Sequence, residues 1–206
     1  SGTILLDAAD EITINAAVDP TIVTLEADDD IVINAAVVAT DLITVSAGQD
    51  STGSIVQNAG GTLTTTGAGS DISLTSGSTS GDISLAENIT VLDRLTITSQ
   101  DTVSQSAGTV TAPNLLLLGA SDVTLNQATN DFDTVAADLA PGFVTLTDTD
   151  DIAVGTVGAT VGLATGDAGN GGAVTINATN GTITVSQSIN TTLGTGGGIS
   201  ITGDVD

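Results

Sequence analysis

Residues 3–18 read TILLDAADEITINAAV, and residues 22–37 repeat this pattern as IVTLEADDDIVINAAV. Ile12 of the first stretch recurs as Ile31 of the second, and Asn15 recurs as Asn34. Each copy contains short runs in which apolar residues occupy every second position, which is the pattern of a β-strand with one buried face. A period of about 20 residues built from such runs is typical of a solenoid, in which each coil packs only against its neighbours.

Short apolar–x–apolar units continue to the other end of the chain, for example at Ile43/Val45, Ile72/Leu74, Ile83/Leu85, Val123/Leu125, Val144/Leu146, Val174/Ile176 and Ile199/Ile201. Clusters of Gly, Asp, Asn and Ser, which are turn formers, separate these units. An antiparallel β-sandwich would also space its strands about 8 to 12 residues apart. The repeat and the scarcity of Asn-Gly hairpin turns favour the solenoid.

The sequence therefore predicts an all-β fold, a right-handed parallel β-helix that forms a single β-solenoid domain over residues 1–206. At about 20 residues per coil it would have roughly ten coils and a length of about 50 Å. Residues 76–81 and 136–142 are expected to project as loops. Residues 100–165 depart from a clean repeat, so their register is not predicted.

Asparagine follows the strand pattern at four corners: Asn15, Asn34, Asn126 and Asn177. Asparagine tolerates the left-handed backbone conformation of a tight corner. Amides stacked from one coil to the next can also bond to one another. Both explanations give these residues a structural role.

The chain resembles the repeats of filamentous-haemagglutinin-type adhesins, which are secreted bacterial β-helix surface proteins. The motifs that carry this resemblance are DITINA-like and DISLTS segments and the GGAVTINATNGTITV stretch of residues 171–185. It is clearest over residues 3–38 and 171–202. The resemblance implies a right-handed parallel β-helix on a bacterial surface or in a secreted fibre, and it specifies the fold better than the function.

The composition restricts the partners of the chain. With 25 Asp and Glu residues against a single basic residue, Arg94, the net charge is −24. Such a surface repels nucleic acids and anionic membranes. There is no cysteine, so the chain needs neither an oxidising nor a reducing compartment. A trypsin-like protease has one cleavage site and aromatic residues are few, which suits an extracellular or cell-surface location. No apolar run is long enough for a membrane span.

The chain lacks most of the residue types that enzymes use for catalysis. Histidine, cysteine, lysine and tyrosine are all absent, so the usual nucleophile–base pairs cannot form. Neighbouring acids such as Asp131 and Asp133 resemble the acid clusters of β-helix enzymes that cut polysaccharides. Those enzymes generally also need basic residues to bind an anionic substrate. We therefore predict no enzymatic activity, no catalytic residue, no cofactor-binding residue and no required cofactor.

Calcium is the ion that the acids would suit best. When the two copies of the repeat are aligned, three acids of the first copy fall on acids of the second, and a further cluster lies between residues 148 and 151. Oxygen-rich acidic turns are ligands for hard cations, and a cation would bridge carboxylates that otherwise repel. The alternative is that the acids serve turns and lie in solvent. The candidate metal ligands are Asp7, Glu26, Asp10, Asp29, Glu11, Asp30, Asp148, Asp150 and Asp151.

The sequence leaves three functions open. The first is a structural and adhesive rod of a bacterial surface or secreted fibre, which would contact a host or neighbouring cell. The second is a filament subunit that joins copies of itself head to tail through the exposed edges of the solenoid, as a homo-oligomer. The third is a surface module that binds cations or carbohydrate, for which the scarcity of aromatic rings is unfavourable.

Overall fold

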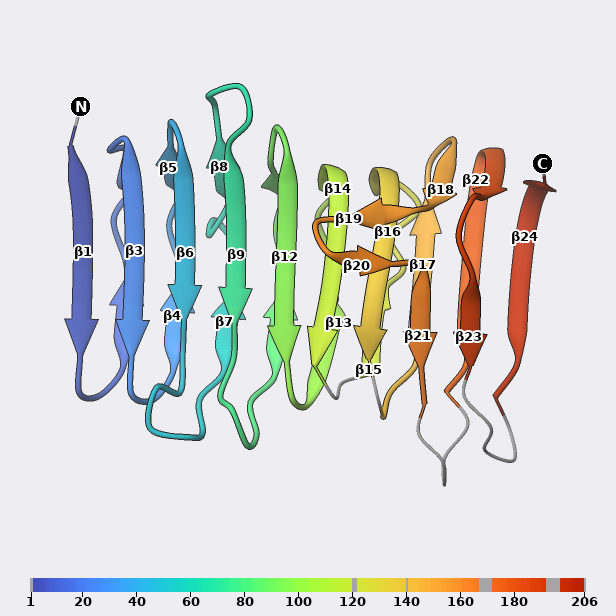
Figure 1. Ribbon diagram of the computed structural model, residues 1–206. Helices are drawn as coiled ribbons and strands as arrows, with labels where there is room; N and C mark the ends of the chain where they lie inside the picture. The colour runs from blue at the N-terminus through green and yellow to red at the C-terminus, as the bar shows by residue number, and fades with distance from the viewer. Residues whose placement is uncertain (1, 120–121, 140, 167–171, 192–196, 206) are drawn as a thin grey trace.

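The computed structural model describes residues 2–119, 122–139, 141–166, 172–191 and 197–205, and these form strands and turns without a helix. Twenty-two strands, all paired in parallel, form one sheet that winds round a common axis. Figure 1 shows the near strands running down and the far strands running up as the coils advance from the N-terminal end on the left. This path is right-handed, and the predicted parallel β-helix is confirmed.

Each coil contributes to three faces. The first face stacks β1 (Thr3–Ala8), β3 (Ile22–Ala27), β6 (Leu42–Ser46), β9 (Asp71–Thr75), β12 (Arg94–Ser99), the second parts of β14 (Val110–Gly119) and β16 (Asp131–Leu139), β21 (Leu163–Thr165) and β23 (Ile189–Thr191). The second face stacks β2 (Ile12–Ile14), β4 (Ile31–Ile33), β7 (Ile55–Gln57), β10 (Ile83–Leu85), β13 (Thr102–Gln105), β15 (Asp122–Leu125), β17 (Val144–Asp148) and the first parts of β22 (Val174–Val185) and β24 (Ile199–Val205).

The third face is shorter. It consists of β5 (Val37–Ala39), β8 (Leu63–Thr65), β11 (Ile89–Thr90) and the first residues of β14 and β16. Beyond β16, β18 (Ile152–Val154) pairs with Thr134 and Val135 at the start of the first-face part of β16, and the ends of β22 and β24 stack on β18. Within the described residues, the first and second faces each stack nine strands. At about 4.8 Å per strand spacing, the rod is about 40 Å long.

The length of a coil varies because its corners vary. The register pairs Thr3 with Ile22 but Leu42 with Asp71, so the coil that begins at Leu42 is longer by half than the coil that begins at Thr3. The additional residues lie in loops at the corners, including residues 47–54 and 76–82, so the loop predicted over 76–81 is confirmed. Although some coils are longer than the repeat of the first two, the described residues form nine coils, close to the predicted number of roughly ten.

The middle of the chain is regular, contrary to its appearance in sequence. Arg94, Asn114 and Thr134 stack on one another in three successive coils. The pattern is hidden because β14 turns a corner at Pro113 and then continues through the unbroken apolar run of residues 115–118. The loop predicted over residues 136–142 is wrong in its first part, because residues 136–139 complete β16.

The core consists of columns of aliphatic side chains, one from each coil. Ile12, Ile31 and Ile55 head one such column on the second face, and each is buried. Phe132 is the one aromatic residue in the core. At most levels aliphatic residues of similar volume stack on one another and fill the interior without large rings, and the buried Gln57 and Gln105 are exceptions in one inward column.

A short hairpin interrupts the first face at its eighth level. Val154 and Leu163 pair with Val135 and Ala137, which are close neighbours in β16, so residues 155–162 leave the coil as an insertion. They form the antiparallel pair β19 (Thr156–Val157) and β20 (Thr160–Val161), which crosses the outside of the first face in Figure 1. Its Val157 is buried in a second apolar cluster with Leu116 and Ala136.

We predict that the column of Leu74 stabilises the rod far more than any exposed leucine. Leu74 is fully buried in β9, whereas Leu92 is 46% exposed between β11 and β12. Leu74→Ala should lower the free energy of unfolding by about 2–5 kcal/mol, because it leaves a cavity. The same substitution at Leu92 should cost less than about 1 kcal/mol. Urea unfolding followed by circular dichroism measures both, and equal costs would contradict the column as the source of stability.

Candidate functional site at the acidic corners

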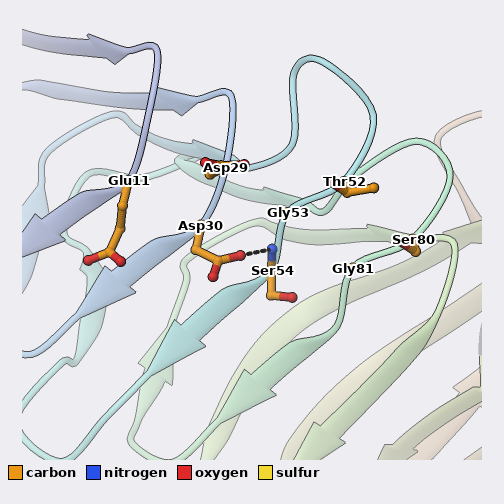
Figure 2. Close-up of a pocket in the computed structure, with 8 residues that line it drawn as sticks. All are labelled: Glu11, Asp29, Asp30, Thr52, Gly53, Ser54, Ser80 and Gly81. Atoms are coloured by element: carbon orange, nitrogen blue, oxygen red, sulfur yellow. Dashed lines mark hydrogen bonds between the residues drawn. The ribbon is translucent and has the colours of Figure 1, made fainter.

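An open groove lies at the corner between the first and second faces. Its volume is ≈ 430 Å³, and it is lined by Glu11, Asp29, Asp30, Thr52, Gly53, Ser54, Ser80 and Gly81. Figure 2 shows the carboxylates of Glu11 and Asp30 side by side on successive coils, with the hydroxyl-bearing loops beyond them. The groove thus joins acids from the first two coils to hydroxyls and backbone from the next two.

The structure brings the predicted acid pairs of the first two coils together. Asp7 stands directly beside Glu26 in the register of β1 and β3. The corners that hold Asp10 and Glu11, and Asp29 and Asp30, are one coil apart, since the Ile12 N–H donates to the Asp30 carbonyl at 3.0 Å. Asp148 is the last residue of β17, the seventh strand of the second face, and Asp150 and Asp151 follow it, so this cluster is separate from the first corner.

Several corner side chains accept a backbone N–H from the following coil. The Asp30 carboxylate accepts from the Ser54 N–H at 2.8 Å. The Ser54 hydroxyl accepts from the Asp82 N–H at 3.2 Å, and the Asp82 carboxylate from the Thr102 N–H at 3.0 Å. Each acceptor precedes a strand of the second face, where ladder pairing begins. These side chains therefore satisfy backbone donors that would otherwise lack a partner.

The same arrangement recurs further along the rod. Asp122 accepts from the Phe143 N–H at 3.2 Å, and Asp151 from the Thr182 N–H at 2.7 Å. Sequence reasoning missed this role, because the acceptor and its donor lie a whole coil apart along the chain. The recurrence of Asp directly before several apolar–x–apolar units, such as Asp30, Asp82 and Asp122, is the signal that could have found it.

The arrangement of acids gives the calcium hypothesis no geometric support. Among the described residues, no group of three or more Asp, Glu, His or Cys side chains is placed to hold a metal ion. Acids of successive coils do lie beside one another, but they do so in pairs, and two carboxylates do not surround an ion. Calcium binding remains a prediction from the sequence.

The stacking of asparagine amides is confirmed at the first of the predicted corners. The side-chain amide of Asn34 donates to the side-chain oxygen of Asn15 at 2.8 Å, and the side-chain amide of Asn58 donates to the side-chain oxygen of Asn34 at 2.9 Å. Asn58 was not predicted, because it follows Gln57, which occupies an inward position where the repeat has an aliphatic residue. The ladder ties three successive coils together on one corner.

Asp148 is the one fully buried carboxylate among the described residues. It accepts from the Phe132 N–H at 2.7 Å and from the Asp150 N–H at 3.0 Å. Burial, together with the nearby charges of Asp150 and Asp131, raises its pKa to about 6, although the two hydrogen bonds act to lower it. Burial and the charges of Asp150 and Asp133 also raise the pKa of Asp131.

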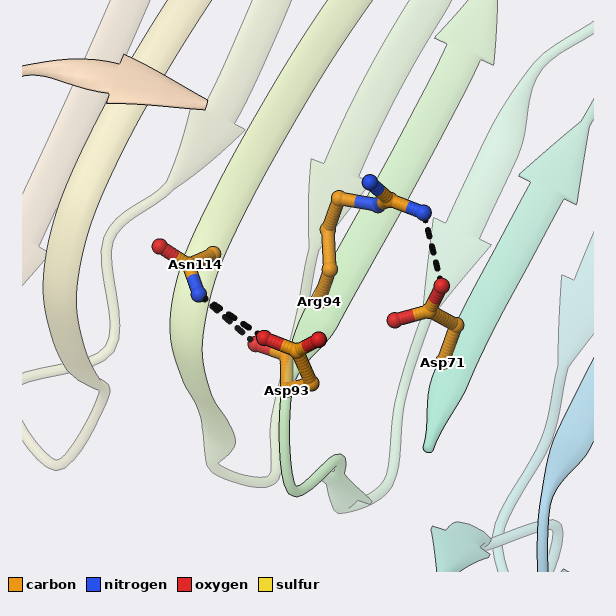
Figure 3. Close-up of polar contacts among 4 residues, drawn as sticks. All are labelled: Asp71, Asp93, Arg94 and Asn114. Carbon is orange, nitrogen blue, oxygen red and sulfur yellow. Dashed lines mark hydrogen bonds and ion pairs between the residues drawn. The ribbon is translucent and has the colours of Figure 1, made fainter. Parts of the chain in front are cut away.

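Arg94 is held on the first face by an acid of the preceding coil. Its guanidinium lies 2.6 Å from the Asp71 carboxylate, and the two residues are register partners. Figure 3 shows this pair beside Asp93, which accepts from the Asn114 amide at 3.0 Å. Both members of the ion pair are partly exposed, so it contributes at most about 1 kcal/mol.

No known protein family, curated protein or solved structure matches the chain. Among the described residues, none belongs to a helix long and apolar enough to cross a membrane.

We predict that Asp30 acts as a hydrogen-bond acceptor rather than as a required charge. Asp30→Ala removes the acceptor for the Ser54 N–H and should cost about 1 kcal/mol of unfolding free energy. Asp30→Asn keeps an acceptor oxygen and removes a charge beside Glu11, so its melting temperature should stay at or above that of the unsubstituted chain. Differential scanning calorimetry measures both variants.

The calcium hypothesis predicts a different result for the same variants. Millimolar calcium should then raise the melting temperature of the unsubstituted chain, and Asp30→Asn should abolish that rise. A melting temperature that calcium leaves unchanged would rule out a calcium site at this corner. Magnesium at the same concentration is the control for ionic strength.

We predict that acidification stabilises the chain through Asp148. Its folded pKa of about 6 lies above the unfolded value of 3.8, so the folded state binds the proton more tightly. Stability should therefore rise as the pH falls from about 7 towards 4, by up to about 3 kcal/mol from this group. Urea unfolding at several pH values measures the slope.

Asp148→Asn should flatten that slope, because the titrating group is gone. Asp122→Asn is the matched control, since it removes the same charge from an exposed acid that also accepts a backbone N–H. If both variants keep the slope of the unsubstituted chain, the pH dependence comes from general repulsion among the acids and not from Asp148.

Proposed function

We propose that the chain is a stiff structural rod of a bacterial surface protein or secreted fibre, whose side faces adhere to a host or neighbouring cell. The observation that carries the proposal is the stacking of nine coils through continuous parallel pairing, with a solid aliphatic core. The resemblance of the repeats to filamentous-haemagglutinin-type adhesins supports the same function.

The direction of the hydrogen bonds suits a rod under tension. The strands run across the rod, so their ladder bonds point along its axis and every coil boundary is crossed by a set of them. The register of β14 with β16 alone joins eight residue pairs. A pull along the axis therefore loads many bonds at once at each boundary. The fold thus supplies length and stiffness.

The outer surface favours neutral or cationic partners. On the second face, the outward column holds hydroxyl residues at seven of nine levels, namely Thr13, Ser84, Ser104, Thr124, Thr145, Thr175 and Ser200. Acids occupy the corners, and the single basic side chain is engaged by Asp71. Such a surface offers hydrogen bonds to polar partners and repels phosphate-rich ones.

Carbohydrate binding has weaker support. The groove at the acidic corner has no aromatic platform on which a sugar ring could stack. Of the two aromatic residues, Phe132 is buried in the core and Phe143 lies beside β17, several coils away. A structural and adhesive rod is therefore better supported than a carbohydrate-binding module.

The proposal predicts that the chain is displayed outside the cell and resists proteolysis there. Antibodies against the chain should label intact source cells or their secreted fibres. Labelling that appears only after permeabilisation would overturn the extracellular assignment. Beads coated with the chain should then adhere to neighbouring cells, and beads coated with the heat-unfolded chain serve as the control.

Trypsin should leave the native rod uncut, because its one site follows Arg94 within β12, which pairs with β9 and β14 on its two sides. The unfolded chain should give two fragments, residues 1–94 and 95–206. Rapid cleavage of the native chain at Arg94 would show that the middle of the rod opens, and would contradict a load-bearing role.

A further inference from the structure

The second face carries an unbroken column of hydroxyl side chains in the middle of the rod. Its members lie on five successive coils, from β10 to β22, and each is the register partner of the next: Ser84, Ser104, Thr124, Thr145 and Thr175. All five are half-buried and point outwards, between residues of the same strands that are buried. Although the chain has 25 acids, none stands in this column, which we call the hydroxyl column.

A second uncharged column runs beside the hydroxyl column, two residues further along each strand. Thr147 of β17 and Asn177 of β22 are register partners. Ser106 and Asn126 hold the corresponding positions directly after β13 and β15. The two columns therefore form a grid of polar groups, with a spacing of about 4.8 Å from coil to coil and about 6.6 Å along each strand.

The constant register prevents the hydroxyls of the column from bonding to one another. Neighbours about 4.8 Å apart are too distant for a direct hydrogen bond, whose donor and acceptor lie about 2.8 Å apart. Among the described residues, no hydroxyl of the column takes part in a hydrogen bond within the chain. Water must therefore satisfy them. A water bonded to two successive hydroxyls at about 2.8 Å each would make an angle of about 118° between them, which is close to tetrahedral.

The grid is rigid before any ligand arrives. Each of β13, β15, β17 and β22 is paired with a strand on both sides. Threonine is stiff about its first side-chain torsion, so Thr124, Thr145 and Thr175 hold their hydroxyls in fixed places. A surface that is already ordered loses little conformational entropy when it binds. Such a surface suits a partner that is itself rigid and periodic.

We propose that this grid binds ice, so that the second face adsorbs to the lattice of a growing crystal. Hexagonal ice is a tetrahedral network of water. Its oxygen atoms repeat along one crystal axis at nearly the spacing of the coils, and along the perpendicular axis at slightly more than the spacing of two residues in a strand. The row of waters held by the hydroxyl column would therefore continue into the crystal. Ice excludes ions, and the two columns are uncharged although the chain as a whole is strongly acidic.

The first face is a poorer fit to a flat crystal. The hairpin of β19 and β20 stands outside it in Figure 1, and the ion pair of Arg94 with Asp71 places charges on it. A neutral polysaccharide is the other periodic partner that hydroxyls could bind, but neither column offers an aromatic ring on which a sugar could stack. Ice binding goes beyond the proposed function, which names a cell as the contact, and does not depend on it.

Uptake into ice tests the proposal on the purified chain. The chain contains no lysine, so an amine-reactive dye labels it only at its terminal amine. Ice grown slowly from a solution of the labelled chain should take up the dye, and single crystals in that solution should grow with facets. Thr145→Tyr places a bulky ring in the centre of the grid and should abolish both effects, because it holds the face away from a flat crystal.

Thr96→Tyr is the matched control, since Thr96 is a half-buried outward threonine in the middle of the first face. Tyrosine suits strand positions, and the melting temperatures of both variants show that they are folded. The control should keep full uptake. Equal loss in the two variants would overturn the proposal, as would exclusion of the unsubstituted chain from ice. Binding to insoluble cellulose without uptake into ice would assign the grid to a polysaccharide and would also overturn it. Antibody labelling of cells judges the extracellular location separately.

Discussion

Parallel stacking in constant register is the constraint on which the rest of this molecule depends. Each residue lies about 4.8 Å from its counterparts on the coils before and after it. A residue type that packs well at one level therefore packs well at the next, and a charge that repels at one level repels again. The aliphatic columns of the core use the first property. The corners, which hold most of the acids, must accommodate the second.

The corners accommodate their acids by using them as hydrogen-bond acceptors for the backbone. Asp30, Ser54 and Asp82 each accept an N–H from the following coil. A carboxylate bonded in this way satisfies a donor at the point where strand pairing begins, which offsets part of the repulsion from its neighbours. From Asp30 onward, Ser54 separates the charges of Asp30 and Asp82 by two levels, whereas Glu11 and Asp30 remain on adjacent levels. Acids at these positions need no ion to account for them.

The fold was predictable from the sequence because the first two coils carry the same residue types at the same levels, as the pairing of Ile12 with Ile31 shows. Later coils were harder to place, since corner loops of different length break the period without changing the columns. In β14 the alternation was hidden because the outward Leu116 is covered by the hairpin of β19 and β20. The acids were predicted less well. Asp148 resembles the turn acid Asp150 in sequence, yet it takes the last inward position of β17, and only the structure reveals its burial.

A solenoid spreads its polar and charged side chains along its length, and this limits the kinds of binding site that the chain can form. Each coil packs only against its neighbours, so the groove described above gathers its residues from four successive coils. Repetition along the sides is therefore the main means by which such a rod can make contacts. The sides carry a column of hydroxyls flanked by acids, which suits weak contacts repeated many times.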